Sequence, residues 1–160
     1  MKITYLHHSG FSVETETKVL LFDYYTEGGR KAYFDPAAYP DKAVFVFVSH
    51  AHEDHYDRRI LSWAKLPNVR YVLSFDVRTE AGFEGRVLRA EPHRTYDFDG
   101  ISIQTLRSND EGVAFLVKAD GKTIYHAGDL NWWHWNGESD AFNNMIKKQY
   151  TSEIDKIKGV

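Results

Sequence analysis

The sequence predicts a layered α/β domain, in which helices pack on the faces of β-sheet. The first 23 residues carry three short strand signals separated by turns. A continuous apolar run, Val44–Val48, is typical of a strand that is covered on both faces. Helical spacing follows at Asp57–Lys65 and again at Ser139–Lys158. This order of strands, helix, strands and helix favours an α/β or α+β layer arrangement.

The predicted strands are short runs rich in β-branched and aromatic residues, bounded by turn residues. Ser9-Gly10, Asp99-Gly100 and Asp120-Gly121 mark turns, and the last pair is a good hairpin signal. Residues 24–41 contain Gly and Pro turn signals without a sustained period, so we expect a long surface loop there. The strands are expected at Ile3–Leu6, Phe11–Glu14, Val19–Asp23, Val44–Val48, Val69–Ser74, Val87–Ala90, Ile101–Leu106, Val113–Val117 and Thr123–Ala127.

The two predicted helices have apolar stripes of different length. The first places Tyr56, Ile60 and Ala64 on one stripe with Trp63 beside it, and Pro67 marks its end. The second is amphipathic, because its apolar residues recur three or four positions apart. These residues are Phe142, Met145, Ile146, Tyr150, Ile154 and Ile157.

Composition limits the class of protein. A chain of 160 residues suits one domain with a single core, which we assign to residues 1–160. Its 20 Lys and Arg against 23 Asp and Glu, without a basic cluster, argue against nucleic-acid binding. No apolar stretch approaches the ~20 residues that span a bilayer, and no signal peptide is evident at the start. We therefore expect a cytoplasmic protein with a small-molecule substrate and no membrane partner.

Metal-binding residue types are concentrated directly after the buried strand, at His50, His52, Asp54 and His55. In an extended stretch the first two point to the same side, while the last two lie in the turn and face a second point. Two metal subsites are therefore expected, and the absence of cysteine leaves only His, Asp and Glu as ligands. Such ligands suit Zn²⁺, with Mn or Fe not excluded. The alternative is a set of surface histidines in a polar loop.

The run His50-Ala51-His52-Glu53-Asp54-His55 also resembles the signature of the metallo-β-lactamase superfamily. Leu6-His7-His8-Ser9-Gly10-Phe11 looks like the opening strand and turn of its broad hydrolase branch. Ile124-Tyr125-His126-Ala127-Gly128-Asp129 resembles its Gly-Asp element at the end of a later strand. The resemblance covers essentially the whole chain and implies an αββα sandwich.

The resemblance also implies roles for individual residues. One metal would take His50, His52 and a third histidine, and the other would take Asp54, His55, a bridging Asp129 and a last histidine. Hydroxide between the metals would be the nucleophile. Independently of the family, a carboxylate after a glycine at the end of an apolar strand is placed to reach two cations. The alternative for Asp129 alone is a simple Gly-Asp turn.

The chain departs from the family pattern at two points. Where the third histidine is expected, it reads Arg107-Ser108-Asn109-Asp110-Glu111-Gly112, and Asp110 is the best substitute. The alternative is that Asp110 only occupies a turn while a water fills the position. The last histidine has no match, and the family's second half is missing. We therefore expect only the N-terminal portion of the sandwich, incomplete at its C-terminus.

The function expected from these residues is metal-dependent hydrolysis of an ester-, lactone- or phosphoester-like bond, with Asp54 and His55 as the catalytic pair. The alternative is a non-catalytic metal-binding half-domain whose metals serve folding or assembly. His8 is either a group that orients a ligand or a surface histidine, and His93 is interpreted as surface. Apolar residues exposed by the missing half predict a homodimer. They include some of Trp132, Trp133, Trp135, Phe142 and Ile146.

Overall fold

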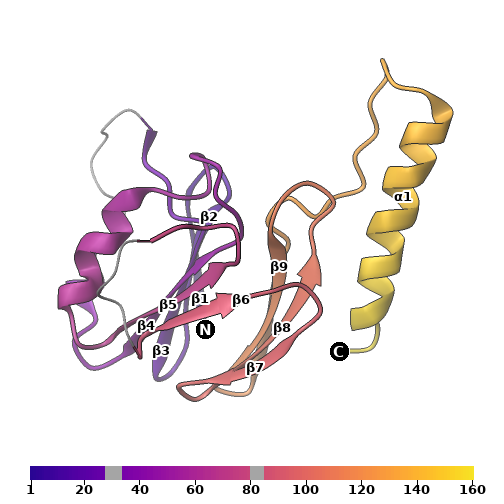
Figure 1. Ribbon diagram of the computed structural model, residues 1–160. Coiled ribbons are helices and arrows are strands. Elements are labelled where there is room, and N and C mark those ends of the chain that lie inside the picture. Colours follow the sequence, from indigo (N-terminus) through magenta and orange to yellow (C-terminus); the bar gives the residue numbers. More distant parts are fainter. Residues whose placement is uncertain (28–33, 80–84) are drawn as a thin grey trace.

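Two β-sheets stacked face to face form the body of the protein (Figure 1), in a computed structural model that describes residues 1–27, 34–79 and 85–160. Residues 28–33 of the expected surface loop lie outside the described residues. The first sheet has the order β1-β2-β3-β4-β5-β6, antiparallel from β1 to β3 and parallel from β3 to β6. Its strands are β1 (Lys2–His7), β2 (Gly10–Glu14), β3 (Lys18–Phe22), β4 (Ala43–Val48), β5 (Val69–Ser74) and β6 (Val87–Ala90).

The second sheet is antiparallel throughout and has the order β10-β9-β8-β7. Its strands are β7 (Thr95–Phe98), β8 (Ile101–Arg107), β9 (Val113–Ala119) and β10 (Lys122–His126). The sequence prediction missed β7, because this short strand has only two apolar residues, Tyr96 and Phe98, facing the core. The other strands lie where the sequence places them.

Strand β4 shows why the sheets stack. Its alternate residues Phe45 and Phe47 enter the core between the two sheets, whereas Val44, Val46 and Val48 enter a second core on the outer face of the first sheet. All five are fully buried, as a continuous apolar run predicts.

The outer face of the first sheet is covered by η3 (Arg58–Lys65), a 3-10 helix. The sequence prediction of a helix is confirmed, although the helix is of the tighter 3-10 type rather than α; its buried residues are Ile60 and Trp63. The Asp57 side chain caps the start by accepting a hydrogen bond from the amide of Arg59 at 2.8 Å.

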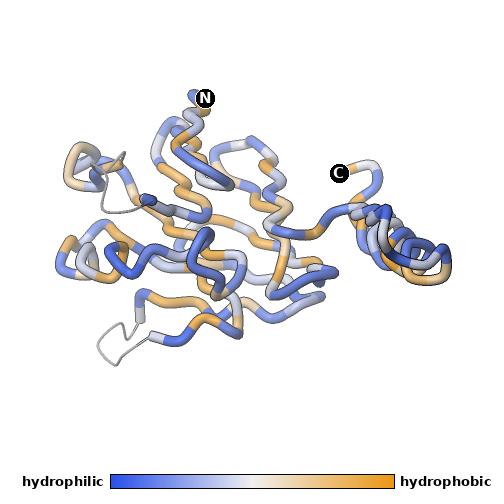
Figure 2. Tube along the Cα trace, turned by 90° about the horizontal axis from the view of Figure 1, so that it is seen from above, coloured by the Kyte–Doolittle hydropathy of each residue, from blue (hydrophilic) through white to orange (hydrophobic). Residues whose placement is uncertain are grey.

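The outer face of the second sheet carries α1 (Asp140–Ile154), followed by the 3-10 turn η4 (Asp155–Ile157). Both views show α1 to one side of the sheets, joined to them by an extended segment (Figures 1 and 2). Its apolar contacts form a small cluster of Leu106, Ala114 and Leu130 with Tyr150, Ile154 and Ile157. The Ser139 hydroxyl caps the helix by accepting from the amide of Phe142 at 3.2 Å. The layers are helix, sheet, sheet and helix, which confirms the αββα arrangement.

Two sequence expectations concern residues around α1. Some of five apolar residues were expected to be exposed, and Trp132 and Trp135 are about half exposed whereas Ile146 is buried. His93, interpreted as a surface residue without partners, contacts Glu153 of α1 at 2.9 Å. Glu153 also accepts from the amide of Arg107 at 3.0 Å, so it ties α1 to β8.

One end of the sandwich is closed by Asp120 from the β9–β10 turn. Its carboxylate accepts hydrogen bonds from the Thr15 hydroxyl at 2.7 Å, the Thr17 amide at 2.7 Å and the Lys18 ammonium at 2.9 Å. These three partners belong to the β2–β3 turn and the start of β3, so Asp120 joins the first sheet to the second. Within the described residues, no helix has both the length and the apolar character needed to cross a membrane.

Candidate metal centre

The candidate metal centre lies at the other end of the sandwich, where parallel strands of the first sheet end together. Asp23 follows β3, Ser49 and His50 follow β4, and Asp76 follows β5. The strand ends are held in register, since the Asp23 amide donates to the carbonyl of Phe47 at 3.0 Å. Asp76 fixes the next turn by accepting from the amide of Ala51 at 3.0 Å. Carboxyl ends of parallel strands are a common place for functional side chains.

Two glycines allow loops of the second sheet to approach this edge. Gly112 has φ +68°, and a Cβ there would lie 1.9 Å from the carbonyl oxygen of Ser49. Gly128 has φ +52°, and its Cβ would lie 2.7 Å from that of Ser49. Only glycine fits such close approaches at positive φ. They bring Asp110 and Asp129 next to His50.

The first donor group consists of His50, His52, Asp110 and Asp129, whose ligand atoms all lie within 4.8 Å of one another. His50 is fully buried, and its Nε2 has no hydrogen-bond partner among the described residues. The Ser49 hydroxyl donates to Asp23 at 2.7 Å, so it is free to accept from Nδ1 of His50 at 3.0 Å. The proton of a neutral His50 then resides on Nδ1, which leaves a lone pair on Nε2.

The second donor group consists of His8, Asp54 and His55, which also lie within 4.8 Å of one another. Nδ1 of His55 donates to Asp23 at 2.8 Å, which directs Nε2 toward the other carboxylates. Nε2 of His55 lies 4.0 Å from Asp54 and 3.2 Å from Asp129.

Asp129 stands between the two groups. One of its oxygens lies 3.2 Å from Nε2 of His55, and the other lies 3.7 Å from Nε2 of His50. Ligands of a tetrahedral metal with bonds of about 2.1 Å are separated by roughly 3.4 Å, which is near both distances. The carboxylate is therefore placed to bridge two cations.

Asp23, a buried carboxylate in contact with the site, was not predicted from the sequence. It accepts from the Ser49 amide and hydroxyl, each at 2.7 Å, from His55, and from Nε2 of His126 at 2.7 Å. His126 belongs to β10, so Asp23 also joins the two sheets. The signal that could have found it is a charged residue directly after an apolar strand, the same feature that singled out Asp129.

Electrostatics at the site reflect this arrangement of carboxylates and imidazoles. Burial disfavours a charged His55, but hydrogen bonds to Asp129 and Asp23 outweigh it and raise the pKa of His55 to about 10. Burial, together with the nearby His55, lowers the pKa of His50. The hydrogen bond from His55 lowers the pKa of Asp129. Burial would raise the pKa of Asp23, yet the charges and hydrogen bonds of His126 and His55 hold it well below its usual range.

The structure brings all six residues predicted as metal ligands to one end of the sheets, including Asp110, whose position the sequence left open. It also places Glu111, which the prediction omitted, 3.3 Å from Nε2 of His52. The Trp132 ring lies beside Tyr150 of α1, with ring centroids 6.3 Å apart. Trp132 therefore packs against the C-terminal helix.

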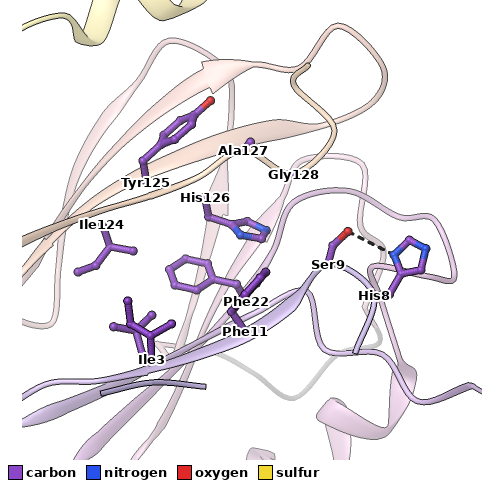
Figure 3. Close-up of a pocket in the computed structure, with 11 residues that line it drawn as sticks. Ile3, His8, Ser9, Phe11, Phe22, Ile124, Tyr125, His126, Ala127 and Gly128 are labelled. Atoms are coloured by element: carbon purple, nitrogen blue, oxygen red, sulfur yellow. Dashed lines mark hydrogen bonds between the residues drawn. The ribbon is translucent and has the colours of Figure 1, made fainter. Parts of the chain in front are cut away.

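A cavity of about 460 Å³ opens beside the site, between β1 and β2 of the first sheet and β10 of the second. Its lining residues include His126 and Ser9 together with the apolar Phe11, Phe22 and Ile124 (Figure 3). Its walls are largely apolar.

Two stacked sheets with a helix outside each, and metal-binding side chains at one sheet edge, define a metallo-β-lactamase-type architecture. The model of the beta-lactamase superfamily domain matches residues 2–143, so the chain belongs to this family. The resemblance seen in the sequence is thereby confirmed.

Curated relatives carry a functional description. A UPF0173 metal-dependent hydrolase of Pyrococcus abyssi is 30% identical over 142 residues, covering 81% of this chain and 61% of that protein. A UPF0173 metal-dependent hydrolase of Desulforamulus reducens is 31% identical over 146 residues, covering 81% and 62%. The chain thus spans about three fifths of the length of the curated relatives it matches.

Solved structures share the fold. A metallo-β-lactamase of Cronobacter sakazakii, mutated in its HARLDQ motif, aligns with a TM-score of 0.58 at 14% identity, covering 99% of this chain and 73% of that one. CmlA, a diiron β-hydroxylase from Streptomyces venezuelae, aligns with a TM-score of 0.53 at 16% identity, covering 80% and 29%. At these identities the likeness concerns the fold alone.

Proposed function

We propose that this chain is the metal-binding portion of a metal-dependent hydrolase that acts on an ester-, lactone- or phosphoester-like bond of a small molecule. The observation that carries the proposal is the position of Asp129 between two groups of metal donors. The names of the curated relatives, metal-dependent hydrolases, support the same class.

The residues present fit divalent metals. Nε2 of His50 is buried, without a hydrogen-bond partner in the described part of the chain, and carries a lone pair directed at the site. The carboxylates that stabilise a proton on His55 would equally stabilise a cation at its Nε2. We assign one metal to His50, His52, Asp110 and Asp129, and the other to Asp54, His55 and Asp129. Zn²⁺ suits these donors, and iron is an alternative, supported by the description of CmlA, a neighbour of similar fold, as a diiron enzyme.

Each residue has a defined part in the proposed reaction. Divalent metals held by these residues would lower the pKa of water toward ~7 and so supply a nucleophile at neutral pH. Asp23 and Ser49 fix the orientations of His55 and His50 through hydrogen bonds. The side chain of Asp54 is 45% exposed, so it is accessible to take the proton of the leaving group.

The test combines metal content with turnover. After reconstitution with Zn²⁺ or Mn²⁺, the protein should hold metal in both groups and hydrolyse members of a panel of aryl esters, lactones and phosphodiesters. His52→Ala should reduce metal content at least severalfold, because this residue belongs to the first donor group. His93→Ala is the matched control, since His93 contacts α1 instead.

The outcomes separate the two functions considered. Metal binding with no turnover on any member of the panel would favour the non-catalytic metal-binding domain. Metal content below about a tenth of an equivalent after reconstitution would refute both. Equal metal loss in the two variants would show that the site is misplaced.

A further inference from the structure

We propose that His8 is a direct ligand of the second metal, completing the subsite formed by Asp54, His55 and Asp129. This inference rests on the proposed function, because it concerns a ligand of the same centre. Those three side chains supply three donors, and a catalytic metal can expand its coordination from four to five, so a fourth protein donor still leaves a position for water.

The position of Nε2 of His8 supports this role. It lies 3.5 Å from the carboxylate of Asp54, beyond an ordinary hydrogen bond. The separation is close to the roughly 3.4 Å expected between two ligands of one tetrahedral metal with bonds of about 2.1 Å. The ring of His8 meets that of His55 edge to face, with centroids 5.8 Å apart. The two imidazoles therefore approach Asp54 from different directions, as ligands around one ion do.

The other ring nitrogen of His8 is already engaged. Its Nδ1 lies 3.3 Å from the hydroxyl of Ser9, a contact visible in Figure 3. When Nδ1 carries the proton and donates to Ser9, the lone pair of Nε2 faces the Asp54 carboxylate. A lone pair and an anion repel one another unless a cation lies between them.

The backbone of the β1–β2 turn holds His8 there at a conformational cost. His8 has φ +52°, a region that few residues other than glycine adopt, although histidine is among those enriched in it. The turn is fixed beside Asp23, because a Cβ on Gly10 would lie only 3.0 Å from the carbonyl oxygen of Asp23. The same strand end therefore positions both His55, through the Asp23 carboxylate, and His8, through the turn. Strained backbone conformations cluster at functional sites, so the conformation of His8 beside a group of metal donors is consistent with a role in metal binding.

The experiment compares His8→Asn with His7→Asn as the matched control. Asparagine tolerates positive φ, so His8→Asn removes the imidazole while keeping a residue suited to the turn. Both variants are first shown to retain the wild-type far-UV spectrum and unfolding midpoint without metal. Zn²⁺ binding is then followed by calorimetry, and Co²⁺ binding by its visible absorption, which reports the coordination of each subsite.

We expect wild type and His7→Asn to bind metal at both subsites. His8→Asn should retain the first subsite and lose affinity at the second by at least about tenfold, since even indirect supports of a ligand are worth 10- to 100-fold. Its Co²⁺ spectrum should differ from that of the wild type only while the second equivalent of Co²⁺ is added. His8→Asp, which restores a donor atom, should recover part of the affinity.

Two results would overturn the inference while leaving the proposed function intact. One is a His8→Asn variant that binds two metals with wild-type affinities and spectra. The other is a wild type that binds one metal, lost in His52→Ala but not in His8→Asn. A wild type that binds no metal would instead reject the proposed function itself, and the role of His8 with it.

Discussion

At each end of the sandwich, one aspartate joins the first sheet to the second. At one end Asp120, from the second sheet, binds Thr15, Thr17 and Lys18 of the first. At the other end Asp23, from the first sheet, binds His126 of the second together with neighbours on its own sheet.

The two ends differ in the further contacts made by the residues that bind each aspartate. Thr15, Thr17 and Lys18 direct their hydrogen bonds at Asp120, which makes that end a structural clasp. The partners of Asp23 each have a second polar atom, and in His55 that atom, Nε2, is directed toward further donors. Similar carboxylate chemistry therefore holds the fold at one end and orients metal ligands at the other.

The largest expected effect comes from removing the charge of Asp23. Asp23→Asn removes the buried negative charge that faces His55 and His126 and replaces one accepting oxygen by an NH2 donor, so we expect roughly 3–5 kcal/mol lower stability, as for other broken buried pairs. Urea unfolding of metal-free protein measures this, with exposed Asp41→Asn as the control. A loss below about 1 kcal/mol, typical of a surface site, would contradict the role given to Asp23.

The two ends of the sandwich can also be compared through two glycines with positive φ, one at each end. Gly112→Ala and Gly121→Ala share a backbone cost of roughly 1–2 kcal/mol. Nothing lies within 4 Å of a Cβ at Gly121, whereas a Cβ at Gly112 meets the backbone of Ser49. We expect Gly112→Ala to cost about 1–3 kcal/mol more, from overpacking. It should also displace Asp110 and reduce metal content, and equal unfolding midpoints for the two variants would be inconsistent with this packing.

At the clasp, Asp120→Asn should lower stability by about 1–2 kcal/mol, because hydrogen bonds to a charged group are lost at a partly solvated site. Metal content should not change, since Asp120 lies at the end of β10 remote from Asp129. Chemical unfolding and elemental analysis on the same samples check both statements. Loss of metal in this variant would show that the two ends are coupled.

The smallest expected effect is a pH dependence of the stability difference between the wild type and Asp120→Asn. Hydrogen bonds from Thr17 and Lys18 lower the pKa of Asp120 below its ordinary value. A lowered folded-state pKa stabilises the protein fully above the unfolded-state value of about 3.9, and this contribution is lost as pH falls through the folded-state pKa. The stability gap between wild type and Asp120→Asn should therefore be constant from about pH 5 to 8 and shrink below about pH 4. A gap that persists unchanged at pH 3 would argue against the clasp.

Much of the fold was readable because its local signals agree with its long-range packing. The run Val44–Val48 predicts a doubly covered strand, and both faces of β4 are buried in separate cores. Strand β7 was missed because Thr95–Phe98 gains its structure from pairing with β8 more than from its own composition.

The candidate site could be predicted from the sequence only where its residues are close together along the chain. His50 to His55 stand in one run, but the place of His8 depends on a turn that only tertiary structure positions. Asp23 was missed for a similar reason, since its histidine partners are 32 and 103 residues away. Whether Asp110 reaches His50 depends on how closely Gly112 approaches Ser49, which no local pattern encodes.

The attachment of α1 has a consequence for the motions of the protein. The helix is held to the sheets by the small apolar cluster at Leu106, Ala114 and Leu130 and by the polar contacts of Glu153. Strands β3 and β4, in contrast, are buried on both faces. Amide hydrogens of α1 will therefore exchange with solvent through local opening, at a lower free energy than amides of the central strands, whose exchange requires unfolding of the sandwich.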